Sequence, residues 1–252
     1  STNEKTAMEA ALGMSYMGKR AMVCMKHVGL NVCMDPFVNS SMTGVEGGVV
    51  VLVADDPSMH SSQDEQDSRY LGSFAMIPML EPVNQQQAYD MMGYAFDLSE
   101  KFKVTVLMRV TTRMAHSRAV VEVAESAREE NPLSYDAKAR DWVLLPANAR
   151  RKNDILVGNQ PLFAKEAAEA GWSSLEIKNS PLGIIASGVG WNYVMETFGG
   201  NCPYSVLRVA QYPLSKEAVS TLASSCSRIL VVEEGQPFIE QQIKGLLPLQ
   251  WE

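Results

Sequence analysis

The chain lacks three features that would place it in a common functional class. Its 252 residues carry 22 Lys and Arg against 29 Asp and Glu, for a net charge of −7, so no basic surface for nucleic acid is predicted. Its four cysteines form no Cys-x-x-Cys pair, which argues against a zinc site or an iron–sulfur cluster within this chain. No apolar run approaches the roughly 20 residues of a membrane span. We therefore expect no nucleic-acid, metal or membrane site.

The cysteines and the amino-terminal residues together indicate a compartment. Four separated cysteines are typical of reduced thiols, and residues 1–5 do not resemble a signal peptide. We expect a soluble, cytoplasmic protein. With 46% hydrophobic residues, the chain is long enough to bury a substantial core, and we favour two domains over one. The 15 methionines are interpreted as adaptable core fillers.

The clearest element is a strand at residues 49–53, where four valines and a leucine lie between a glycine pair and an Asp-Asp-Pro stop. An uninterrupted apolar run of this length predicts a strand buried on both faces, as in parallel sheets. A polar loop follows and contains His60, Ser61 and Gln63. In open α/β sheets the ligand lies beyond the carboxyl ends of the strands, so this loop is the predicted site.

Strands and helices alternate along most of the chain, which predicts an α/β fold with two doubly wound, mainly parallel sheets. Helices are expected at residues 7–14, 33–42, 85–101, 164–170, 191–198, from 215 and at 237–246, and strands at 21–25, 49–53, within 73–80, and at 104–109, 182–187, 205–209 and 229–234. Residues 26–31 are expected to form a second loop at the carboxyl end of a strand. The predicted division is 1–124, a connector at 125–180, and 181–252.

Several motifs have two interpretations each. The Gly188-Val189-Gly190 turn lacks the third glycine of a dinucleotide site, because Tyr193 stands there, so a structural turn is favoured. The acids Glu233 and Glu234 end a predicted strand and are either site residues or solvated side chains.

The charged and histidine side chains near the predicted loops are equally open. Arg109, Arg113 and Arg118 are better explained by ion pairs than by an anion site. His27 and His60 have no metal spacing and are either structural or functional. Glu4, in the first turn of a helix, is on spacing alone a surface group that complements the helix dipole.

Five stretches carry a resemblance to a known family. They are residues 3–7, 25–31, 53–67, 145–151 and 182–246. Their order and spacing resemble the large subunits of the indolepyruvate:ferredoxin oxidoreductases, which depend on thiamine diphosphate. The resemblance implies that residues 1–124 form a pyrimidine-binding domain lacking its amino end. It also implies that residues 181–252 form a domain similar to the carboxyl-terminal domain of transketolase.

The same resemblance implies roles for individual residues. Glu4 matches the glutamate that hydrogen-bonds the aminopyrimidine ring and activates the cofactor for proton removal. His27 and His60 become catalytic candidates. The implied cofactor-binding residues are Glu4, Lys26, Val28, Gly29, Ser61 and Gln63.

The implied reaction is the oxidative decarboxylation of an arylpyruvate to an acyl-coenzyme A, with ferredoxin as the electron acceptor. The implied partners are a small subunit, ferredoxin, the 2-oxo acid and coenzyme A, in an oligomer. The family's magnesium motif and its ferredoxin-like cysteine clusters do not occur in these residues. We therefore expect half of a thiamine diphosphate and magnesium site, with iron–sulfur clusters in missing segments or partner chains, and no activity from this chain alone. The alternatives are a non-catalytic assembly or regulatory module and, less favoured, a nucleotide-binding domain.

Overall fold

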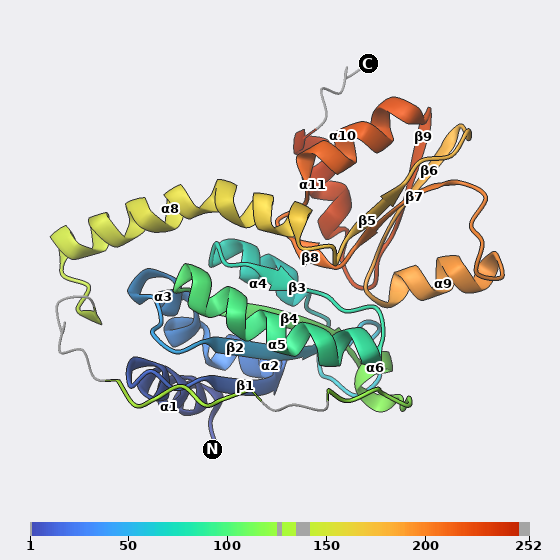
Figure 1. The fold of residues 1–252 in the computed structure, drawn as a ribbon. Coiled ribbons are helices and arrows are strands. Elements are labelled where there is room, and N and C mark those ends of the chain that lie inside the picture. Colours follow the sequence, from blue (N-terminus) through green and yellow to red (C-terminus); the bar gives the residue numbers. More distant parts are fainter. Residues whose placement is uncertain (1, 125–127, 135–141, 247–252) are drawn as a thin grey trace.

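The computed structural model describes residues 2–124, 128–134 and 142–246, which form two sheets with flanking helices (Figure 1). The first elements are α1 (Glu4–Tyr16), β1 (Ala21–Lys26), α2 (His27–Val32), α3 (Met34–Thr43), β2 (Val49–Asp55), α4 (Ser68–Phe74), β3 (Met79–Leu80), α5 (Gln85–Phe102), β4 (Val106–Thr111) and α6 (Thr112–His116). The later elements are α8 (Pro146–Glu169), β5 (Ser174–Glu176), β6 (Leu182–Ser187), α9 (Val189–Thr197), β7 (Ser205–Val209), β8 (Gln211–Tyr212), α10 (Lys216–Ser225), β9 (Arg228–Val232) and α11 (Phe238–Leu246). The predicted α/β class is confirmed.

The five-stranded sheet has the order β1-β2-β4-β3-β8. The predicted buried strand is β2, which pairs in parallel with β1 on one side and with β4 on the other. Alternate side chains of β2 serve the two faces of the sheet. Val51 packs in one core with α1 and α3, whereas Val50 packs with Met91 and Leu98 of α5. The uninterrupted valine run therefore reflects a strand covered on both sides.

Helix α5 covers one face of this sheet, and the cap predicted for it is present. The side chain of Asn84 accepts a hydrogen bond from the backbone N–H of Gln87 at 2.8 Å, which satisfies one of the donors left open in a first helical turn. The other face is covered by α1 and α3, and Asn3 caps α1 in the same way, accepting from Lys5 N at 2.9 Å.

The four-stranded sheet has the order β5-β7-β6-β9. Strands β7 and β9 both pair in parallel with β6, whereas β5 is antiparallel to β7. The strand predicted at residues 205–209 is β7, and Ser215 caps α10 as predicted, accepting from the N–H of Ala218 at 3.2 Å. The transition from strand to helix at the end of β6 is the Gly188 turn.

Several predictions of local structure were wrong. Residues 26–31, expected as a loop, include most of the short helix α2. By contrast, the strand expected within residues 73–80 is confirmed as the short β3, Met79–Leu80. Within the predicted connector, α8 starts at Pro146 rather than near residue 164, and Ser174–Glu176 is strand β5. Figure 1 shows α8 running along the five-stranded part to the four-stranded sheet. Parts of the connector, and residues 247–252, lie outside the described residues.

Strand β8 connects the two parts of the chain through hydrogen bonds. It follows β7 of the four-stranded sheet in sequence, yet it pairs antiparallel with β3 at the edge of the five-stranded sheet. The pairs are Met79 with Tyr212 and Leu80 with Gln211. The five-stranded sheet thus contains a strand from the carboxyl-terminal part of the chain. None of the helices in the described ranges has the length and apolar character needed to cross a bilayer.

Candidate functional site

Glu4 lies in the first turn of α1 and packs against α2. A β-carbon added at Gly29 would stand 2.8 Å from Cγ and 2.9 Å from Oε1 of Glu4, so only glycine leaves room for this side chain. Glu4 is one of the residues that line a hollow of about 330 Å³, together with Thr2, Asn3, Ala7, Met22, Val23, Cys24 and Met25. Among residues 2–124, 128–134 and 142–246, no hydrogen-bond or ion-pair partner is found for its oxygens.

Lys26 and His27 connect the end of β1 to the polar loop. Nζ of Lys26 donates to the carbonyl oxygen of Ser61 at 2.9 Å. His27 is fully buried, and its Nε2 lies 3.2 Å from the carbonyl oxygen of Asp64 and 3.3 Å from Oδ1 of the same residue. A carbonyl oxygen only accepts, which assigns the ring proton to Nε2. Nδ1 is then a buried acceptor without a partner in the described part of the chain.

Asp56 holds the polar loop in shape. Its buried carboxylate accepts hydrogen bonds from the backbone N–H of His60 at 3.2 Å and of Ser61 at 2.7 Å, and from the hydroxyl of Thr112 at 2.7 Å. Burial opposes ionisation, but these hydrogen bonds outweigh it and lower the pKa of Asp56. Ser58, at φ 67°, lies in the left-handed region, so the chain doubles back within the loop. From the sequence, Asp56 is expected only to end a strand, as part of the Asp-Asp-Pro stop. An aspartate before Pro-Ser is also a signal for side-chain capping of a turn.

The structure brings together most of the predicted site residues. Glu4 contacts Gly29, and Lys26 contacts Ser61, all near the carboxyl ends of β1 and β2. Val28 is half-buried in α2. The side chains of His60 and Gln63 are exposed. The predicted roles of these residues stay predictions. Within the described ranges, no group of three or more His, Cys, Asp or Glu side chains is placed to hold a metal ion.

The open motifs of the second sheet have structural explanations. A β-carbon at Gly188 would lie 2.8 Å from Oε1 of Glu81. A carboxylate from the first part of the chain therefore already lies at the start of α9, where a nucleotide phosphate would have to bind. Glu233 is largely buried and pairs with Arg69 at 2.8 Å, and Glu234 pairs with Arg113 at 3.3 Å. Arg109 forms ion pairs, as favoured from the sequence.

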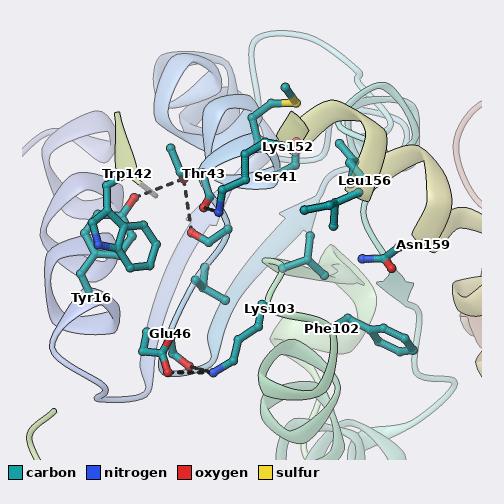
Figure 2. Close-up of a pocket in the computed structure, with 15 residues that line it drawn as sticks. Tyr16, Ser41, Thr43, Glu46, Phe102, Lys103, Trp142, Lys152, Leu156 and Asn159 are labelled. Atoms are coloured by element: carbon teal, nitrogen blue, oxygen red, sulfur yellow. Dashed lines mark hydrogen bonds and ion pairs between the residues drawn. The ribbon is translucent and has the colours of Figure 1, made fainter. Parts of the chain in front are cut away.

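A second hollow, of about 270 Å³, lies at the opposite, amino-terminal ends of β2 and β4, beneath α8. Figure 2 shows Trp142 lying on Tyr16, with ring centroids 4.0 Å apart, and Lys152 pointing to Thr43, whose carbonyl oxygen it reaches at 3.0 Å. Lys103 is paired with Glu46 at 3.0 Å. Both lysines thus have protein partners, and the hollow is remote from the predicted loop.

The comparisons with known proteins agree with the resemblance found in the sequence. The family model described as "Pyruvate flavodoxin/ferredoxin oxidoreductase, thiamine diP-bdg" matches residues 1–165. The "Indolepyruvate oxidoreductase subunit IorA" of Archaeoglobus fulgidus is 38% identical over 98% of this chain and 40% of its own length. The protein with the same description from Pyrococcus abyssi is 42% identical over 97% of this chain and 39% of its own length. The chain thus spans about two fifths of these relatives.

A solved structure shows the fold alone. The protein titled "Split gene transketolase, inactive beta4 tetramer" is 13% identical, with a TM-score of 0.57, and the match covers 99% of this chain and 69% of that one. This similarity agrees with the predicted α/β fold of two mainly parallel sheets. The family model covers well over half of the residues, and the chain therefore belongs to the thiamine diphosphate-binding family of pyruvate flavodoxin/ferredoxin oxidoreductases.

Proposed function

We propose that this chain forms the pyrimidine side of a thiamine diphosphate site in a 2-oxo acid:ferredoxin oxidoreductase subunit. The observation that carries the proposal is the placement of Glu4, a residue that lines a hollow; its side chain packs on Gly29, and its carboxylate has no partner among the described residues. A carboxylate in this state is available to accept a hydrogen bond from a ligand. The family match supports the cofactor, and the names of the relatives support indolepyruvate or a similar arylpyruvate as the substrate.

The residues around Glu4 suit this half of a site. When bound, thiamine diphosphate supplies the nucleophilic carbon for decarboxylation of a 2-oxo acid. Glu4 would accept a hydrogen bond from the pyrimidine ring and hold a proton at that contact. Lys26 and His27 anchor the polar loop beside it through Ser61 and Asp64. His60 and Gln63, whose side chains are exposed, would meet substrate or a further domain.

We assign the remaining parts of the enzyme to other segments or chains. Magnesium, the iron–sulfur clusters and the coenzyme A and ferredoxin contacts would be supplied outside these residues, by the rest of a longer subunit or by a small partner subunit in an oligomer. The described residues contain no cluster suited to a metal. The proposed division is a pyrimidine-binding domain at 1–124, a connector at 125–180 and a transketolase-like domain at 181–252. This chain alone would then be inactive.

The test is a pair of isosteric substitutions in the full-length subunit, assembled with its partners. Glu4→Gln keeps the shape of the side chain but weakens the acceptor, and we expect turnover of indolepyruvate to fall about 100-fold or more. Glu9→Gln is the matched control, because Glu9 is an exposed acid on the same helix. Normal turnover of the Glu4 variant would contradict the proposal and favour the non-catalytic module.

A further inference from the structure

A cluster of buried charges joins the two sheets. We call it the interface network; its members are Asp55, Asp67, Arg69, Glu81, Arg109 and Glu233. The two arginine side chains are 0% and 1% exposed. Buried ion pairs of this kind do little for net stability when compared with apolar packing, but removing one partner is costly. The network therefore fixes one arrangement of the elements that it connects.

Arg109 reaches across from β4 to the far sheet. Its Nε contacts Oδ2 of Asp55 at 2.5 Å, its Nη1 contacts Glu81, and its Nη2 donates to the carbonyl oxygen of Glu234 at 2.8 Å. Glu234 follows strand β9 of the four-stranded sheet. A single planar guanidinium thus binds three groups at once, in the fork geometry that arginine offers and lysine does not.

Arg69 makes a parallel connection from the start of α4. Its Nε donates to Oδ1 of Asp67 at 2.9 Å, while Nη1 lies 2.8 Å from Oε2 of Glu233. Its Nη2 also reaches the carbonyl oxygen of Gln236 at 3.1 Å. Burial disfavours the charged form, but the surrounding acids outweigh that cost and raise the pKa of Arg69. Both arginines therefore hold the turn at residues 234–236.

Two of the acids that pair with these arginines, Asp55 and Asp67, stand at the two ends of the polar loop. Asp55 is the last residue of β2, and Asp67 is the N-cap of α4. Asp55 also accepts from the backbone N–H of Ser68 at 3.0 Å, which closes the loop on itself. The segment between them contains Ser61 and Asp64, the contacts of Lys26 and His27.

In the turn at residues 234–236, the backbone of Gly235 packs closely against the interface network. Gly235 has φ 99°, and a β-carbon there would lie 2.9 Å from Oδ2 of Asp67 and 3.1 Å from Nη2 of Arg109. Its backbone therefore packs directly on Asp67, which ends the polar loop, and on Arg109, which pairs with that loop's two end residues. A shift of this turn toward the network would have to move Asp67 or Arg109.

We propose that Arg69 and Arg109 are positioning residues through which the turn at 234–236, beyond the four-stranded sheet, fixes the polar loop of the other sheet. The position of the four-stranded part then determines the positions of His60, Ser61 and Asp64 in the polar loop. The effect on cofactor binding rests on the proposed function, whereas the effect on the loop does not.

Two glycine substitutions in the full-length, assembled enzyme test this. Gly235→Ala puts a methyl group against Asp67 and Arg109. Gly200→Ala is the matched control, because Gly200 has a similar φ of 85° but nothing within 4 Å of its β-carbon position. The first readout is hydrogen–deuterium exchange of the His60 and Ser61 amides, which Asp56 protects. We expect about tenfold faster exchange in Gly235→Ala, as for a loop whose anchor has loosened, and no change in Gly200→Ala.

The second readout separates positioning from general destabilisation. The concentration of thiamine diphosphate that gives half-maximal activity should rise about tenfold in Gly235→Ala, with Tm close to that of Gly200→Ala. Equal amide exchange in the two variants would overturn the proposal. If the wild-type enzyme binds no thiamine diphosphate, the proposed function fails, but the exchange comparison still decides the coupling. If Gly235→Ala does not fold, Tyr212→Phe replaces it. This change removes a hydroxyl that donates to Glu81 at 2.6 Å and accepts from Nη1 of Arg69 at 3.5 Å, and unchanged exchange there also overturns the proposal.

Discussion

The side chain of Glu4 lies against the backbone of Gly29, in a space that a single methyl group would fill. Cγ of Glu4 would be 2.8 Å from a β-carbon at that position, which is closer than real contacts allow. Glu4 belongs to α1 and Gly29 to α2, the helices that precede and follow β1 in the sequence. The direction of the proposed catalytic carboxylate is therefore set by a residue whose only contribution is the absence of a side chain.

Replacing Gly29 should misplace Glu4 without altering its chemistry. In the assembled full-length enzyme we expect Gly29→Ala to lower turnover roughly 10- to 100-fold, since small displacements of a positioned group are costly. Gly13→Ala is the control, because Gly13 is exposed on α1 and has nothing within 4 Å of its β-carbon position. Steady-state rates at saturating substrate give the comparison. Equal rates for the two variants would show that the contact does not orient Glu4.

The stabilisation that Glu100 gives to the folded protein should be lost at acid pH. The hydrogen bonds from Arg20, at 2.9 Å and 2.6 Å, together with one from Asn131, outweigh burial and lower the pKa of Glu100 to about 2. Because the folded-state pKa lies below the unfolded value of about 4.3, this stabilisation is complete above that value and is lost as the pH falls toward 2.

Glu100→Gln should therefore lower the free energy of unfolding by about 1–3 kcal/mol at pH 7. The difference from wild type should shrink as the pH falls from about 4 toward 2. Urea unfolding at several pH values measures it. Asp97→Asn is the control, because Asp97 meets the same Arg20 but is 64% exposed, and surface pairs contribute little. A pH-independent difference would rule out this role for the Glu100 charge.

The cysteines should differ in reactivity toward alkylating reagents. Burial, with a smaller effect from the charge of Glu4, raises the pKa of Cys33 to about 11, and its side chain is 0% exposed. Cys24 is exposed on β1. Treatment of the folded protein with iodoacetamide near pH 8, followed by peptide mass spectrometry, should show Cys24 modified first and Cys33 only after unfolding. Modification of Cys33 ahead of Cys24 in the native protein would contradict the packing described.

Two glycines should respond in opposite ways to alanine. A β-carbon at Gly47 would lie 2.3 Å from the carbonyl oxygen of Lys19, so backbone must move, and we expect a loss of about 2 kcal/mol or more. Gly93, in the middle of α5, has open space, and alanine there should gain about 0.5–1 kcal/mol from helix propensity. Thermal unfolding of both variants checks the prediction, which fails if Gly47→Ala is as stable as wild type.

The sequence was sufficient for elements with a strong local signal. The valine run of β2, the Asn84 cap of α5 and the Ser215 cap of α10 follow from periodicity and side-chain capping, which are properties of neighbouring residues. Helix α2 was missed because it has only six residues and contains Gly29. Strand β8 was missed because its two residues are strand only through pairing with β3, far away in sequence.

The site was predictable only in part, and through the family resemblance rather than through local signals. The resemblance pointed to Glu4, Lys26 and His27, and the structure places them around α2 and the polar loop. Asp56, which organises the loop through the amides of His60 and Ser61, had a local signal in the Asp-Pro-Ser sequence that was not used. The contacts of Arg69 depend on groups from other elements, which no local pattern reveals. The acids Asp55 and Asp67 lie one at each end of the loop, but from the sequence Asp55 only marked the end of a strand and Asp67 had no predicted role.

Strand β8 has a consequence for synthesis on the ribosome. The chain emerges amino end first, so the edge of β3 has no partner until residues 211 and 212 have left the exit tunnel. Until then the sheet consists of β1 to β4, and the backbone N–H and C=O groups along the outer edge of β3 are unpaired. An unpaired strand edge of this kind can pair with other chains. The amino-terminal part therefore completes its sheet only after a segment more than 100 residues downstream of β3 has been translated.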